Sequence, residues 1–201
     1  STTVTVTPIA DGVVEPAETV IMTLKTSAAY TIDPGKSSAI VTITDAVVVR
    51  GSNTRVRPEH GGMAIEFTRA LTVENSGILE ADGLVTVQGP LTVTGGGQIK
   101  VLQTLALNGP LTLTAAGRVE VPGTLSSPLA LTVDGARLTG GRIEAPGLSV
   151  INTGLVTSPD ATTTQVYKLE LDIAGTLLVD ATSSIDVNGR GYLKGRTTGN
   201  T

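Results

Sequence analysis

Residues 91–110 read LTVTGGGQIKVLQTLALNGP, and the same pattern recurs on both sides of this stretch. The triplet Leu-Thr-Val begins at position 91, and it or a close copy begins at positions 71, 111 and 131, so the spacing is constant. Glycines 77, 97 and 117 keep the same spacing. A unit this short cannot bury its apolar face alone, so the period indicates coils that stack on one another.

Within each copy, apolar and polar residues alternate, as they do in a strand with one buried face. Leu91 and Val93 are expected on one side of the strand, and Thr92 and Thr94 on the other. We therefore predict a parallel β-solenoid over residues 71–201, with about 20 residues per coil. Its buried core is predicted to contain one column of equivalent leucines, namely Leu71, Leu91, Leu111 and Leu131.

A second strand in each coil carries a charged residue at the same point of the period. Stacking in register would place Glu80, Lys100 and Glu120 in an outward ladder of alternating charge, which Glu144 would continue somewhat out of phase. Opposite charges on neighbouring strands contribute about 0.2–1 kcal/mol each. The alternative interpretation is a carboxylate pair for acid–base chemistry, and Lys100, between the two acids, argues against it.

The period loosens after residue 146. A further copy would begin at position 151, but Leu148 comes before that position, and Leu169 follows Leu148 by slightly more than one period. The polar residues 157–165 are predicted to form a loop that bulges from one coil, with strands resuming at 175–179 and 184–187. Nothing in the last residues resembles a cap, so we expect the final coil to expose strand edges that invite further pairing.

The composition agrees with an all-β protein and limits the function classes. Of the 201 residues, 24 are Gly and 10 are Pro, and Val, Ile and Thr suit strands better than helices. The net charge is −4 and only 2% of the residues are aromatic, which argues against a nucleic-acid binder. We expect no membrane span, because no apolar run approaches the roughly 18 residues required. Cysteine is absent, and His60 is the single histidine, interpreted as a loop residue.

The first 47 residues follow a different pattern. Alternating strands are expected at 3–6, 19–24 and 39–43, with the acidic stretch DGVVEPAET at positions 11–19 between the first two. The Glu-x-x-Glu-Thr step that ends this stretch and the Ile-Thr-Asp of positions 43–45 resemble the second half of a Calx-β domain. This resemblance implies a partial immunoglobulin-like β-sandwich over residues 1–47. Residues 48–70 are then interpreted as a connector and a first irregular coil.

The same resemblance implies a cofactor. The acidic tips of Calx-β domains often bind calcium, and the acids at matching positions here are Asp11, Glu15, Glu18 and Asp45. Calcium takes six to eight oxygen ligands. Four scattered acids would supply a weak site, and the alternative is that they are solvated turn carboxylates.

These features predict a structural module of a secreted or cell-surface protein and not an enzyme. Three N-terminal strands do not close a sandwich, and the solenoid lacks a cap, so both ends are expected to need a partner. We predict self-association by β-strand addition, head to tail, which generates filaments when the contact does not close. Flanking domains of a larger chain would satisfy the same ends.

Three other functions compete with the structural one. An adhesin that binds carbohydrate or protein needs no sequence motif. A polysaccharide-cleaving enzyme would require convergent acids with a consistent basic partner, a pattern that the sequence does not display. Ice binding by ranks of threonine is suggested by Thr-x-Thr at 92–94 and 112–114, but Glu74 and Asp134 interrupt the rank.

Overall fold

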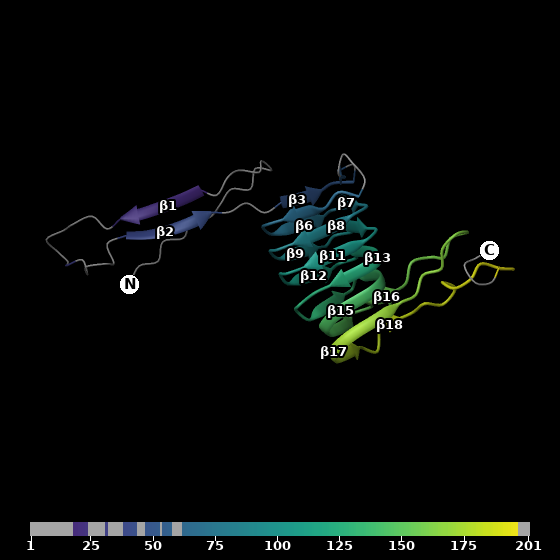
Figure 1. Cartoon of the computed structure of the whole chain (residues 1–201). Helices are drawn as coiled ribbons and strands as arrows, with labels where there is room; N and C mark the ends of the chain where they lie inside the picture. Colours follow the sequence, from purple (N-terminus) through teal and green to yellow (C-terminus); the bar gives the residue numbers. More distant parts are fainter. Residues whose placement is uncertain are drawn as a thin grey trace. The chain divides into compact units, whose positions relative to one another are not determined.

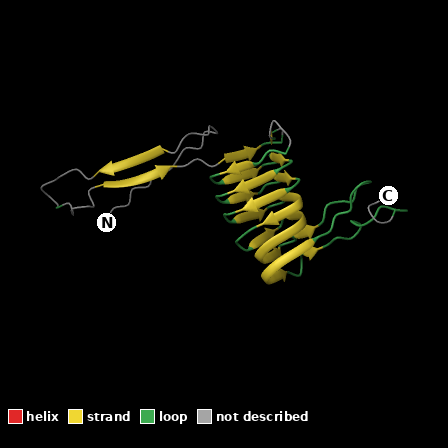
Figure 2. Ribbon diagram, viewed as in Figure 1, coloured by secondary structure: helices red, strands yellow, loops and turns green. Residues whose placement is uncertain are grey.

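The structure is a computed structural model that describes residues 18–23, 31, 38–43, 47–52, 54–57 and 62–196. Every regular element within these ranges is a β-strand, and none is a helix (Figure 2). The chain divides into two compact units, residues 1–46 and 47–201. The all-β prediction is therefore confirmed for the described part of the chain.

The first unit contains one described pair of strands. Strands β1 (Glu18–Thr23) and β2 (Ser38–Ile43) run antiparallel, with Glu18 opposite Ile43 and Thr23 opposite Ser38. These strands lie where the sequence places the second and third strands of a partial sandwich. The first predicted strand, at residues 3–6, lies outside the described residues, and the immunoglobulin-like sandwich stays a prediction.

The second unit is a parallel β-solenoid of about five turns, about 20 residues apart (Figure 1). Each coil crosses three faces, which we call A, B and C after the order in which the chain meets them. Face A holds β3 (Val47–Arg50), β6 (Leu71–Glu74), β9 (Leu91–Val93), β12 (Leu111–Thr114) and β14 (Leu131–Asp134). Face B holds β4 (Arg55–Val56), β7 (Ile78–Ala81), β10 (Gln98–Val101), β16 (Leu155–Thr157) and β18 (Ser184–Ile185). Face C holds β5 (Ile65–Phe67), β8 (Leu84–Val87) and β11 (Thr104–Leu107).

Three longer strands continue from one face to the next. β13 (Arg118–Ser126) crosses faces B and C, β15 (Arg137–Ile151) crosses B, C and A, and β17 (Glu170–Val179) crosses C and A. The register shifts where β13 and β15 turn between faces B and C, and where β15 and β17 turn between faces C and A. The regular early coils and the longer late strands therefore belong to one continuous stack.

The core is a stack of equivalent aliphatic side chains. The leucines at 71, 91, 111 and 131 are all buried. Leu71 pairs with Leu91 and Leu91 with Leu111, and the pairing of Leu113 with Val133 aligns Leu111 with Leu131. The face-A strands β6, β12 and β14 alternate buried and more exposed positions, which is the period-two pattern of their sequence. Full burial of a leucine contributes about 1.5–3 kcal/mol, so this column is a main source of stability.

The corner between faces A and B explains the spacing of the glycines. In the coil of β9, the carbonyl of Thr94 accepts a hydrogen bond from the N–H of Gly97 at 2.8 Å, and the two glycines between them have positive φ. This is a type I′ turn. A Cβ on Gly97 would lie 2.2 Å from the carbonyl oxygen of Val73 in the preceding coil. Positions 77 and 117 have the same close approach, at 2.4 Å.

The strand pairing defines both ends of the stack, and near the second end it overturns one alignment. Residues 47–50 form β3, which pairs in register with β6, so the solenoid begins with Val47 opposite Leu71. The alignment of Leu169 with Leu148 is wrong, because Leu148 pairs with Leu177, further along the chain, and Leu171 pairs with Ile143 on face C. The reason is the excursion at residues 158–169, which contains no strand and lengthens that coil. A loop in this region is what the polar sequence predicts.

Candidate functional site

Face B carries the predicted ladder of alternating charge. Lys100 pairs in register with Glu80 on one side and with Glu120 on the other. The Lys100 Nζ lies 3.7 Å from a carboxylate oxygen of Glu120, whereas Glu80 lies 3.5 Å from a guanidinium nitrogen of Arg55 in the preceding coil. These side chains are partly exposed, and pairs of this kind contribute about 0–1 kcal/mol.

Glu144 does not continue this ladder. Thr139 occupies the next position after Glu120, and Glu144 pairs with Ser126 and Asp172 on face C. There, Arg142 contacts three carboxylates, Glu144 at 2.5 Å, Glu170 at 3.6 Å and Asp172 at 2.8 Å. The hydrogen bond and the charge of Glu144 raise the pKa of Arg142. This cluster joins β15 to β17, so we interpret it as a contact that holds the two strands together.

A second column lies two positions before the ladder on the same strands. Its members in successive coils are Ile78, Gln98, Arg118 and Arg137, each in register with the next. Arg118 and Arg137 therefore occupy adjacent strands, whose spacing is about 4.8 Å. Like charges directly opposite one another are destabilising, so an adjacent pair of arginines requires an explanation.

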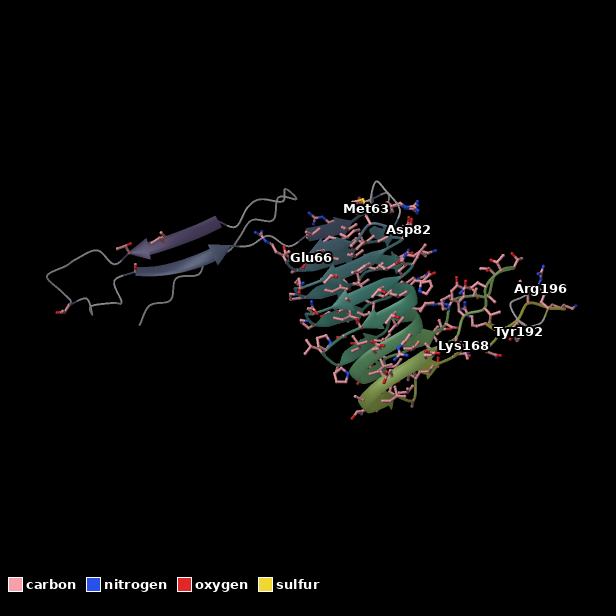
Figure 3. The ribbon with its side chains drawn as sticks, viewed as in Figure 1. Met63, Glu66, Asp82, Lys168, Tyr192 and Arg196 are labelled. Atoms are coloured by element: carbon pink, nitrogen blue, oxygen red, sulfur yellow. The ribbon has the colours of Figure 1, made fainter. Side chains whose placement is uncertain are left out.

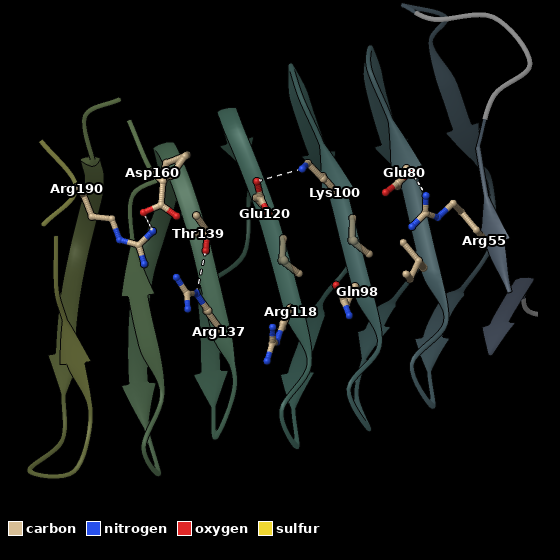
Figure 4. Close-up of a pocket in the computed structure, with 14 residues that line it drawn as sticks. Arg55, Glu80, Gln98, Lys100, Arg118, Glu120, Arg137, Thr139, Asp160 and Arg190 are labelled. Atoms are coloured by element: carbon tan, nitrogen blue, oxygen red, sulfur yellow. Dashed lines mark hydrogen bonds and ion pairs between the residues drawn. The ribbon is translucent and has the colours of Figure 1, made fainter. Parts of the chain in front are cut away.

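Neither of these two arginines has a carboxylate partner among the described residues. Arg118 is exposed and forms no ion pair there, and Arg137 is half-buried and donates one hydrogen bond from Nε to the hydroxyl of Thr139 at 3.3 Å. Figure 4 shows the two guanidinium groups next to each other, on the same side of the sheet. Most of their N–H donors are therefore available to a ligand.

The two columns form the floor of a groove of about 290 Å³ (Figure 4). The excursion after β16 and the segment after β18 contribute Asp160 and Arg190 to its wall, and these two residues form an ion pair with each other. The charged residues that line the groove are Arg55, Glu80, Lys100, Arg118, Glu120, Arg137, Asp160 and Arg190. Five of these are cationic and three anionic, so the groove is positive although the chain carries a net charge of −4.

The excursion and the C-terminal segment extend from the face-B edge of the last coils. Lys168 lies on the first segment and Tyr192 on the second (Figure 3). Both segments lie in a part of the sequence where the period fails. Sequence reasoning therefore missed Asp160 and Arg190, and no periodic signal would have found them. Arg118 was accessible from the period, because it lies two positions before Glu120, whereas Arg137 follows Arg118 by one residue less than the period, so their adjacent position was not.

The last coil is a second candidate site. β17 pairs with β15 and, in the part of the chain that the structure describes, with no other strand. Its side chains are partly or fully exposed along the whole strand. Leu177 is 48% exposed, whereas Leu148, its neighbour in the preceding coil, is 1% exposed. The apolar column thus ends at an uncovered layer.

The side chains of the four predicted calcium ligands are not among those that the structure describes. Asp11, Glu15 and Asp45 lie outside the described residues, and Glu18 begins β1 without a described side chain. His60 also lies outside the described ranges. Within those ranges, no cluster of three or more His, Cys, Asp or Glu side chains has the arrangement of a metal site. The calcium site stays a prediction.

Comparisons with family models, with curated proteins and with solved structures found no significant match to this chain. The described residues also contain no helix with the length and apolar character needed to cross a bilayer. The groove of face B and the exposed last coil are therefore the two features that point to a function.

Proposed function

We propose that the chain is a structural module of a secreted or cell-surface protein, a β-solenoid that self-associates by β-strand addition at its last coil. The observation that carries the proposal is the edge of β17. This strand of ten residues has one partner among the described strands and an exposed apolar surface. Long exposed edges of this kind are templates for pairing with another chain.

Physical chemistry favours a second copy of the chain as the partner. The exposed β17 side chains Leu177 and Val179 continue columns that are aliphatic in the coils below them, with Leu148 and Val150 as their neighbours. A strand with the same alternation would bury them, and would also satisfy the free backbone groups. In the proposed contact, the last coil of one copy meets the N-terminal strands of the next. Such a head-to-tail contact produces a filament unless the rotation closes a ring.

The test is assembly of the purified chain, followed by electron microscopy and analytical ultracentrifugation. The wild type is expected to form filaments of uniform width or oligomers that grow with concentration. Leu177→Lys places a charge at the exposed end of the aliphatic column, where Leu177 is 48% exposed, and is expected to yield monomers. The matched control is Leu129→Lys, at a loop position that is 43% exposed, and it should assemble as the wild type does. A wild type that stays monomeric at all concentrations would refute the proposal.

We also propose that the chain is not an enzyme. The carboxylates that line the groove are the natural candidates for acid–base chemistry, and each has a cationic partner. Glu80 is near Arg55, Glu120 is near Lys100, and Asp160 is near Arg190. Replacing Glu120 with alanine should therefore leave assembly unchanged. A polysaccharide-cleaving activity that disappears in Glu120→Ala would contradict this interpretation.

An adhesin is the second candidate, and the observation in its favour is that Arg118 and Arg137 of the groove have no carboxylate partner among the described residues. Binding by the groove and assembly through β17 use different parts of the solenoid. One function therefore does not exclude the other.

A further inference from the structure

We infer that the groove on face B binds an acidic polysaccharide, with Arg118 and Arg137 holding one of its carboxylate or sulfate groups. The first support is the charge arrangement. The other cations of the groove, Arg55, Lys100 and Arg190, each lie beside a carboxylate. The two arginines at the centre have no carboxylate partner among the described residues, so their charge is left uncompensated.

The second support is the geometry of the donors. Two guanidinium groups on strands about 4.8 Å apart can both direct N–H donors at one oxyanion. Arginine recognises carboxylate and sulfate-like oxyanions in a bidentate manner, and such charge-assisted hydrogen bonds are about twice as strong as neutral ones. Thr139 orients one of the pair by accepting from Arg137 Nε, which leaves the outer edge of that guanidinium free. The side-chain amide of Gln98 continues the column of donors by one further coil.

The third support is the length of the groove. Its floor runs across β4, β7, β10, β13 and β15, which are consecutive neighbours in the sheet. At the usual strand spacing, this path covers roughly 19 Å. A single small anion would occupy only the part beside the two arginines. A chain molecule would use the ion pairs and hydroxyls on either side as further hydrogen-bonding partners.

The surroundings distinguish a polysaccharide from other acidic polymers. An acidic peptide would bind most simply as an added strand, but β10 and β13 already have neighbours on both sides. Single-stranded nucleic acid is usually held by aromatic stacking, and none of the lining residues described for the groove is aromatic. Sugar hydroxyls both donate and accept, so they can pair with the carboxylate acceptors, with the cationic donors, and with the amide and hydroxyl groups of this surface.

The test uses the full chain and isothermal titration calorimetry with defined probes. We expect polygalacturonate or dextran sulfate to bind and uncharged dextran not to bind, with affinity that falls as salt rises. The variant Arg118→Gln/Arg137→Gln should weaken binding by about tenfold or more for each arginine lost. Arg118→Lys/Arg137→Lys keeps the charge and loses the fork of donors, so it should show an intermediate loss.

A matched control removes two positive charges elsewhere. Arg50 and Lys194 are exposed, and neither lines the groove, so Arg50→Gln/Lys194→Gln should bind as the wild type does. Circular dichroism would verify that every variant keeps its β structure. The inference is overturned if neither acidic polysaccharide binds, if dextran binds equally, if the two double glutamine variants behave alike, or if poly-L-glutamate or oligothymidylate binds more tightly.

Binding by the groove and assembly through β17 can be tested independently of each other. Binding is measured with Leu177→Lys, which should be monomeric and retains every groove residue. Loss of binding in that variant would contradict the placement of the site on face B. Retained binding by the monomer would support the groove whether or not the wild type forms filaments.

Discussion

Strands β9 and β17 each place a Leu-x-Val triplet on face A, Leu91 to Val93 and Leu177 to Val179, but the two triplets have opposite environments. Leu91 and Val93 of β9 are completely buried, whereas Leu177 and Val179 of β17 are 48% and 38% exposed. Both pairs belong to the same columns of face A at different levels of the stack, since residues 131, 148 and 177 are successive partners. Alternation within a strand is therefore not enough to bury its apolar face. The next coil has to cover it.

The largest expected effect on stability comes from shortening a leucine of this column, and it should differ between the buried coil and the last coil. Leu91→Ala should reduce the free energy of unfolding by about 2–5 kcal/mol, because it leaves a cavity between two packed coils. Leu177→Ala should cost less than about 1 kcal/mol in the monomer, since half of that side chain already contacts water. Urea unfolding followed by circular dichroism measures both. Equal losses would show that the last coil is covered in solution.

The corner glycine tests how closely the coils approach. Gly97→Ala should destabilise the solenoid by about 1–3 kcal/mol, because its Cβ would lie 2.2 Å from the carbonyl oxygen of Val73. The matched control is Gly191→Ala in the C-terminal segment, where a Cβ meets nothing within 4 Å. That control should change thermal stability little. A tolerated Gly97→Ala would imply that the corners shift freely.

In the next coil, a substitution at the same corner should raise stability and not lower it. Ala115 and Ala116 have φ values of 48° and 62°, where the preceding coil has Gly95 and Gly96. The left-handed conformation destabilises the folded state by about 1–2 kcal/mol for an L-residue. Glycine avoids this cost, but its greater conformational freedom in the unfolded chain reduces stability by about 0.5–1 kcal/mol. Ala115→Gly should therefore raise stability by about 0.5–1 kcal/mol in urea unfolding. Ala181→Gly, at an exposed position without positive φ, should lower it instead.

The smallest effect concerns the turn of the last coil. The carboxylate of Asp180 accepts the backbone N–H of Asn152 at 2.7 Å, and this bond, with those from Ser183 and Thr182, lowers the pKa of Asp180 well below its usual range. Because the folded pKa lies below the unfolded one, the contribution to stability is present above about pH 4 and declines as the pH falls further. Asp180→Asn should flatten the pH dependence of unfolding below about pH 4. An unchanged profile would show that these bonds do not persist in solution.

The outcome of the sequence analysis follows the regularity of the chain. The parallel solenoid, its period and the absence of helix in the described residues all follow from the repeated triplets. The neighbours of Lys100 were predictable for the same reason, since stacking in register makes neighbours of residues that lie one period apart. The placement of Leu169 was wrong because an excursion of irregular length breaks that rule.

Local sequence alone determined the strands, the stacking and the identity of the aliphatic column, since each depends on a period that short-range alternation and glycine spacing encode. Only the tertiary structure decided which charges meet across the groove. Asp160 and Arg190 lie far apart in the sequence, in irregular segments, and the adjacent position of Arg118 and Arg137 depends on a coil that is slightly shorter than the period. The reason is that charges interact according to their distance in the folded chain. The shortened coil and the two irregular segments set these distances. A repeat therefore predicts its own interior, whereas the departures from it shape the surface that a ligand would meet.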